Sequence, residues 1–109
     1  MSYDIDLKIP ACSHCGRGPT TVFSTNYTSN CSGMWFQAGL NLLSLEGKKA
    51  GDCLAYLSEG IACLEADPAR FQAMNPVNGW GDYATTLAWL REIQSAMAEH
   101  PQSIVRVSC

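Results

Sequence analysis

Cysteine and histidine occur close together near the N-terminus, at Cys12, His14 and Cys15. Two thiolates three residues apart on a turn can bind one tetrahedral zinc ion, and histidine is the other common ligand. A structural zinc site needs four ligands, so Cys31 or Cys109 would have to complete it. The alternative is a pair of free thiols, because the following glycines and proline do not favour the helix that a redox C-x-x-C motif begins.

A run of hydrogen-bonding residues extends from Ser24 to Asn30 and reads S-T-N-Y-T-S-N. It lies where an expected strand gives way to an expected helix, and the free amides at a helix start point outward. An anion or a polar ligand can bind at such a place. Ordinary helix capping is the alternative, although capping needs only one or two such residues. The candidate ligand-binding residues are Asn26, Thr28, Ser29 and Asn30.

A tryptophan stands between two glycines in the loop 75–81, which reads N-P-V-N-G-W-G. Asn78-Gly79 marks a tight turn, and a loop that fixes an aromatic ring suits either a buried plug or a recognition surface. We expect mostly burial, because the two glycines let the backbone approach the Trp80 ring from both sides. Replacing Trp80 by alanine would then cost more than about 2 kcal/mol.

The candidate partner-binding residues are Asn78, Trp80 and Trp89. Trp89 falls outside the apolar stripe expected for the last helix, so it is a candidate for an exposed anchor, and tryptophan is enriched in binding hot spots. The opposing expectation is that tryptophans belong to the core.

Groups for acid–base or nucleophilic catalysis are sparse in the sequence. His14 and His100 are the two histidines, and His100 is explained by the end of a helix, where cations are favoured. No spacing predicts a Ser-His-Asp or Cys-His arrangement, and no pair of glutamates is typical of a general acid and base. The sequence therefore favours a protein that is not an enzyme and needs no cofactor.

The composition predicts a single domain over residues 1–109 with an unusually uncharged surface. Charged residues make up 16% of the chain, against about 25% in ordinary globular proteins. Part of the surface is therefore expected to be covered by a partner or by self-association, for example as a homodimer. The net charge of −3 argues against nucleic acid as a direct partner, which requires clustered Lys and Arg.

The N-terminus lacks the basic start and apolar segment of a secretory signal, and no apolar run reaches the roughly 18 residues that a membrane span needs. We expect a cytoplasmic protein with no membrane partner and with its six cysteines largely reduced.

Hydrophobic periodicity predicts an α+β fold. A small antiparallel sheet, made of two N-terminal strands and a C-terminal strand, is expected to pack against about three helices. The predicted strands are 3–9, 20–27 and 103–108. The predicted helical segments are 31–43, 48–66, a short turn at 68–74, and a last helix from 83 to about 100.

Three motifs resemble those of a family of small uncharacterised proteins from tailed bacteriophages and prophages. They are Y-D-I-x-L at 3–7, N-x-T-x-N at 26–30 and N-P-x-N-G-W-G at 75–81, and the resemblance extends over 3–108. Many relatives carry histidine where this chain has Ser29, so a catalytic role in the family would not transfer to it. The resemblance implies an accessory phage protein acting in the bacterial cytoplasm.

These observations lead to three hypotheses. The first is a binding protein that contacts a host protein complex and inhibits a host defence, as an anti-CRISPR protein does. The second is a protein that binds or sequesters a nucleotide signal through the polar run at 24–30. The third, ranked lowest, is a zinc-dependent enzyme using Cys12, His14 and Cys15.

Overall fold

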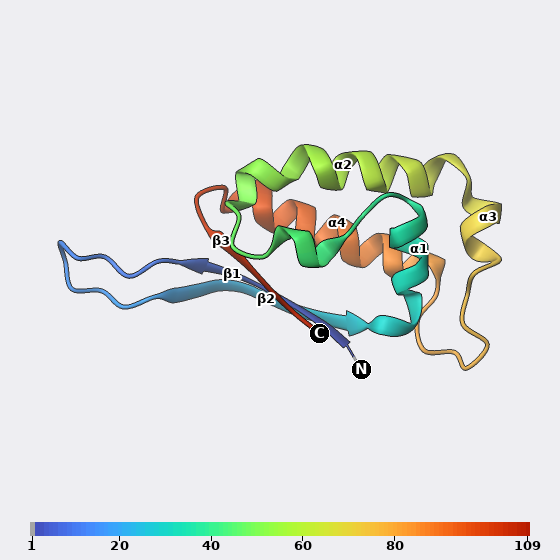
Figure 1. Cartoon of the computed structure of the whole chain (residues 1–109), viewed down its shortest axis with the longest axis horizontal. Coiled ribbons are helices and arrows are strands. Elements are labelled where there is room, and N and C mark those ends of the chain that lie inside the picture. The colour runs from blue at the N-terminus through green and yellow to red at the C-terminus, as the bar shows by residue number, and fades with distance from the viewer. Residues whose placement is uncertain (1) are drawn as a thin grey trace.

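The computed structural model describes residues 2–109 and has the expected α+β architecture (Figure 1). The sheet is three-stranded and antiparallel, as the sequence predicts, and its strand order is β2-β1-β3. In chain order the elements are β1 (Ser2–Ile9), β2 (Thr20–Thr28), the 3-10 turn η1 (Ser29–Cys31), α1 (Ser32–Gln37), the 3-10 turn η2 (Leu42–Leu45), α2 (Ala50–Ala66), α3 (Pro68–Gln72), α4 (Tyr83–Glu99) and β3 (Ile104–Ser108).

The sheet has one covered and one uncovered face. Alternation along β1 places Tyr3, Ile5 and Leu7 in the core, while Asp4 on the opposite face is exposed. Such alternation is the signature of an antiparallel sheet with one wet face. The long helices α2 and α4 lie on the covered side, and the hairpin of β1 and β2 extends beyond them (Figure 1).

The predicted helix over 31–43 is wrong in its length. Helix α1 ends at Gln37 because Gly39 adopts a positive φ of 89°, a conformation that ends helices. The amide of Gly39 donates to the carbonyl of Phe36, and the amide of Leu40 donates to that of Trp35. This pair of bonds closes the helix and directs Leu40 into the core.

A close approach between Gly60 and Leu40 joins helix α2 to the segment after α1. A Cβ atom placed on Gly60 would lie 2.2 Å from Cγ of Leu40, and Leu40 is buried. The glycine within α2 therefore has a packing role that outweighs its low helix propensity.

We predict that Gly60→Ala lowers the free energy of unfolding by about 1–2 kcal/mol, because overpacking costs more than the roughly 1 kcal/mol gained in helix propensity. Urea unfolding measures the change. The control is Glu59→Ala, an exposed neighbour whose effect should stay within about 0.5 kcal/mol. A Gly60→Ala protein more stable than wild type would contradict the close packing.

Candidate binding surface

The structure brings most of the predicted ligand-binding and partner-binding residues to the same place. Asn26, Thr28 and Asn30 line an open hollow of about 550 Å³ together with Asn78 and Trp80. Ser2 and Tyr27 complete the lining. Ser29 does not line the hollow, although it lies between two residues that do. Two sequence segments about fifty positions apart therefore form one surface.

The end of the β1–β2 hairpin positions one side of the hollow. Ser2 pairs with Thr28, and Asp4 pairs with Asn26. After the strand, the hydroxyl oxygen of Thr28 accepts a hydrogen bond of 3.2 Å from the amide of Asn30 and so caps η1. The capping explanation is thus right for Thr28, whereas Asn26 and Asn30 have no capping role among the described residues.

The loop from Asn75 to Gly81 forms the other side of the hollow, and asparagine side chains hold its shape. The amide of Trp80 donates 3.0 Å to Oδ1 of Asn78, closing the turn that the Asn-Gly pair predicts. Oδ1 of Asn75 accepts 2.8 Å from the amide of Tyr83. The loop is therefore attached to the start of α4.

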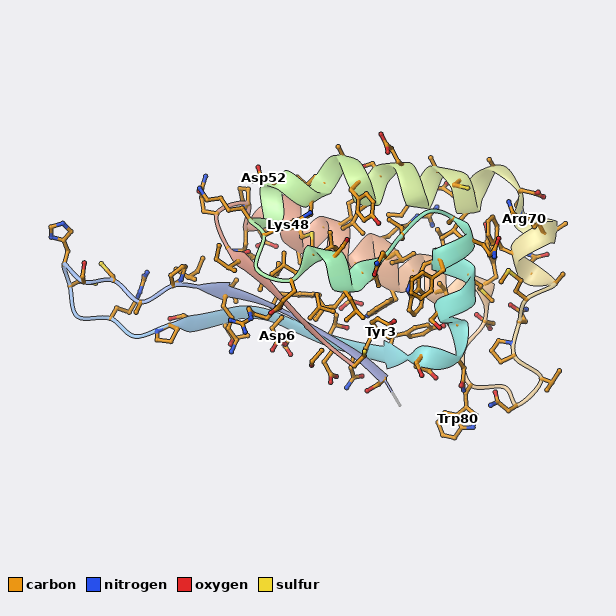
Figure 2. All side chains as sticks on the ribbon, in the orientation of Figure 1. Tyr3, Asp6, Lys48, Asp52, Arg70 and Trp80 are labelled. Atoms are coloured by element: carbon orange, nitrogen blue, oxygen red, sulfur yellow. The ribbon has the colours of Figure 1, made fainter. Side chains whose placement is uncertain are left out.

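Gly81 fixes the loop against the end of β2. Its φ is 90°, and an added Cβ would lie 2.8 Å from Tyr27, Thr28 and Cys31 side-chain atoms. The backbone of the loop, rather than the indole ring, makes this contact. As a result the side chain of Trp80 projects outward from the body of the molecule (Figure 2).

The expectation that Trp80 is mainly buried is wrong, because its side chain is 68% exposed. The two flanking glycines allow the tight turn and the close approach at Gly81, and they do not enclose the ring. Val77 in the same loop is also fully exposed. The loop thus displays two apolar side chains on a backbone that several hydrogen bonds hold.

The expectation that Trp89 is an exposed partner anchor is also wrong, because Trp89 is only 5% exposed. Its ring stacks on Tyr27 with centroids 5.1 Å apart, and its Nε1 donates 3.2 Å to the hydroxyl of Thr25. The apolar stripe of α4 is wider than predicted because it includes the buried Thr86, which lies three residues before Trp89.

The hydroxyl of Tyr27 joins the strand, the loop and helix α4 beneath the hollow. Its oxygen lies 2.7 Å from the hydroxyl of Thr85 and 2.9 Å from that of Thr86. It also accepts 3.3 Å from the amide of Asp82. Burial raises the pKa of Tyr27 above its ordinary value.

Asp82 begins α4 with a reciprocal cap. Its carboxylate accepts 2.8 Å from the amide of Thr85, and the amide of Asp82 donates back to the hydroxyl of Thr85. The bonds from Thr85 hold the pKa of Asp82 below its ordinary value. The cap fixes the point where the loop leaves the helix.

Within residues 2–109, seven residues line the hollow, and none of them is charged. Phosphate sites use Lys, Arg or a free helix N-terminus, and η1 and α1 are too short to supply the last. The surface therefore offers an aromatic face, amide side chains and hydroxyls. These groups suit a neutral partner better than an anion.

The predicted metal ligands do not converge. Cys12, His14 and Cys15 lie in the loop between Ile9 and Thr20, at the far end of the hairpin from the hollow. Cys31 lies beside the carbonyl of Trp80 and Cys109 follows Ser108, which pairs with Asp4. Within residues 2–109 no three Cys, His, Asp or Glu side chains form a metal-binding group, and all six cysteines are free thiols.

The thiols of the hairpin loop interact with each other. The backbone amide of Cys15, then its side chain, and then the amide of His14 lower the pKa of Cys12. The amide of Cys12 donates 2.8 Å to the carbonyl of Arg17 and closes the loop. This arrangement agrees with the alternative of two thiols on a turn.

Comparison with protein-family models, curated proteins and solved structures gives no match. No helix among residues 2–109 is long and apolar enough to span a membrane.

We predict that Trp80→Ala changes the free energy of unfolding by less than about 1 kcal/mol, because an exposed ring leaves no cavity. The control is Trp89→Ala, which removes a buried ring and should cost about 3–5 kcal/mol. The midpoints of urea unfolding test both. Equal losses for the two variants would show that the Trp80 ring is buried in solution.

Tyr27 should make stability fall at alkaline pH. Burial raises the pKa of Tyr27 in the folded state, so the unfolded chain, with its ordinary pKa of 10.0, loses the proton first. The contribution is complete below pH 10 and is lost as pH rises through the folded pKa. Burial raises the pKa of Tyr3 in the same direction.

Urea unfolding between pH 9 and 11 measures this effect as the difference between wild type and Tyr27→Phe, and the variant should lose less stability with rising pH. At neutral pH the same variant should cost about 1–3 kcal/mol, because it leaves the buried Thr86 hydroxyl without the partner it has here. Tyr3→Phe is the second variant, because burial also raises the pKa of Tyr3, and it too should lose less stability with rising pH than wild type. Identical slopes for Tyr27→Phe and wild type would contradict the prediction.

Proposed function

We propose that this chain is a non-enzymatic binding protein that docks on a partner protein through the Trp80 loop and the adjoining hollow. The observation that carries the proposal is a tryptophan side chain that is 68% exposed on a loop held by hydrogen bonds and close packing. Exposed large aromatic side chains in a fixed position are typical of binding hot spots.

The energetic argument rests on burial and on preorganisation. A tryptophan can bury about 150–250 Å², and 68% of that area is exposed here. Covering the exposed part, roughly 100–170 Å², would contribute about 2.5–4 kcal/mol at about 25 cal/mol per Å². The bond from the Trp80 amide to Asn78 and the packing of Gly81 restrict the backbone before binding. Less conformational entropy is therefore lost when the partner docks.

The uncharged lining favours a protein partner over a nucleotide signal. Asn26, Asn30 and Asn78 each offer an amide that can donate to and accept from a polypeptide backbone. A nucleotide could stack on Trp80, but no Lys or Arg lines the hollow to bind its phosphates. A binding surface for a protein segment is thus the better account of these groups.

The partner class we propose is a host protein complex in the bacterial cytoplasm. This step rests on the three sequence motifs that resemble those of small phage and prophage proteins. Such a protein would inhibit a host defence by occupying a contact surface, in the manner of an anti-CRISPR protein. It would require no cofactor and no catalytic group.

The test is capture from bacterial lysate with wild type, Trp80→Ala and Leu43→Ala, followed by affinity measurement with the purified partner. Leu43 is the matched control, because it is a half-exposed apolar residue in η2. We expect Trp80→Ala to weaken binding at least about tenfold, with Leu43→Ala unchanged. Phage plating on a host that carries the defence should fall in parallel. Equal affinity for wild type and Trp80→Ala would refute the proposal.

A further inference from the structure

Strand β2 lies at one edge of the sheet, and no other segment among residues 2–109 pairs with its outer side. It is the longest strand, with nine residues, and seven of these are β-branched or aromatic. It contains no charged residue and no proline. Edge strands usually carry a lysine, a proline or a covering segment, because exposed edges pair with other chains.

The opposite edge of the sheet is covered. The amide of Gly47 donates 2.8 Å to the carbonyl of Val105, and the amide of Val105 donates 2.8 Å to the carbonyl of Lys48. Further along β3, the carboxylate of Glu46 accepts 3.1 Å from the amide of Val107. The segment before α2 thus satisfies the outward groups of β3 in the manner of a short fourth strand.

No such segment accompanies β2. Among residues 2–109, no backbone hydrogen bond joins β2 to any segment outside its own strand pairing with β1 and the cap of η1. The pairing with β1 is regular from Phe23 to Thr28 and shifts register beyond Phe23. A regular stretch of six residues therefore presents outward-facing amides and carbonyls to solvent.

The free edge is continuous with the candidate binding surface. Asn26, Tyr27 and Thr28 belong to β2 and also line the hollow beside Trp80. A strand added along this edge would reach the hollow at its end. Main-chain hydrogen bonds give affinity in such additions, and a side-chain pocket gives specificity.

We propose that the partner binds as an extended, uncharged polypeptide segment that adds a fourth strand beside β2 and places one side chain in the hollow against Trp80. This inference rests on the proposed function and names the element that the surface recognises. The recognised chemistry is an extended backbone with a neutral or apolar side chain at the Trp80 end.

A segment of another protein fits this edge better than a second copy of this chain. Two copies each carry a net charge of −3 and would repel one another. A symmetric pair that used the whole of β2 would place the irregular start of each strand against the regular half of the other. A foreign segment need not carry such an irregular half.

The test uses an uncharged synthetic peptide in which threonine and valine alternate, with acetylated and amidated ends, and amide NMR of the full chain. At millimolar peptide we expect shifts confined to β2 and the Trp80 indole. Exchange of the outward amides of β2 should slow about tenfold at roughly 90% occupancy. A peptide with a central proline, which cannot pair along its length, should have no effect.

Two variants locate the contact. Asn26→Lys places a charge on the edge and should reduce the peptide-induced shifts at least about fivefold. Gln102→Lys is the control, because Gln102 is exposed in the turn before β3; it should leave the shifts unchanged. Sedimentation should show a monomer without peptide.

Peptide-induced shifts elsewhere than β2 and the Trp80 indole, or none at all, would overturn the inference. A dimer that protects the same amides without peptide would also overturn it, in favour of a second copy. The two proposals fail separately. If lysate capture depends on Trp80 while β2 stays unprotected, the edge inference fails and the binding function stands.

Discussion

The hydroxyl of Tyr27 is the interaction on which the displayed surface depends. It joins the end of β2 to Thr85 and Thr86 in α4 and to the amide of Asp82 at the end of the loop. Two segments more than fifty residues apart in sequence, the end of β2 and the start of α4, are thereby joined through one atom. Burial of this hydroxyl raises the pKa of Tyr27.

The aromatic cluster around Tyr27 explains why the bond network can hold a loop in place. Trp35 lies 5.2 Å from Tyr3 and 5.5 Å from Trp89, ring centroid to centroid, and Trp89 stacks on Tyr27. Within residues 2–109, Nε1 of Trp35 is buried without a hydrogen-bond partner, a cost of about 1–3 kcal/mol. Packing of four aromatic rings must outweigh that cost. Trp35 and Trp89 thus belong to the core, whereas Trp80 lies on the surface.

The sequence predicts the fold better than the site because different forces decide them. Alternation in β1 and the stripe of α4 report burial against a sheet or helix, which depends on local periodicity. The exposure of Trp80 and the burial of Trp89 depend on contacts across fifty residues or more. Thr86 is polar, so the sequence alone does not place it in the buried stripe of α4. Its hydrogen bond to Tyr27 explains why it is buried. Trp89, three residues later on the same helix, is buried on the same side.

Some of the site was nevertheless visible in the residue types. The polar run at 24–30 contains more hydrogen-bonding residues than a connector needs, and the N-G-W-G turn adds a tryptophan between two glycines. The two segments lie together in the structure. No local pattern indicates that Gly81 packs on the end of β2, because a glycine chosen for close approach and one chosen for positive φ look the same in sequence.

The contrast between the two sheet edges links these observations. Residues 46–49 cover the outer side of β3, so one edge of the sheet is closed within this fold. It leaves β2 uncharged and open at the same end where Tyr27 and Gly81 hold the Trp80 loop. An open edge strand lowers solubility because it can pair with other chains. The exposed Trp80 ring does not stabilise the fold, although its loop is held in place. Both features become favourable together when a partner strand covers them, which is the physical reason to regard them as one surface.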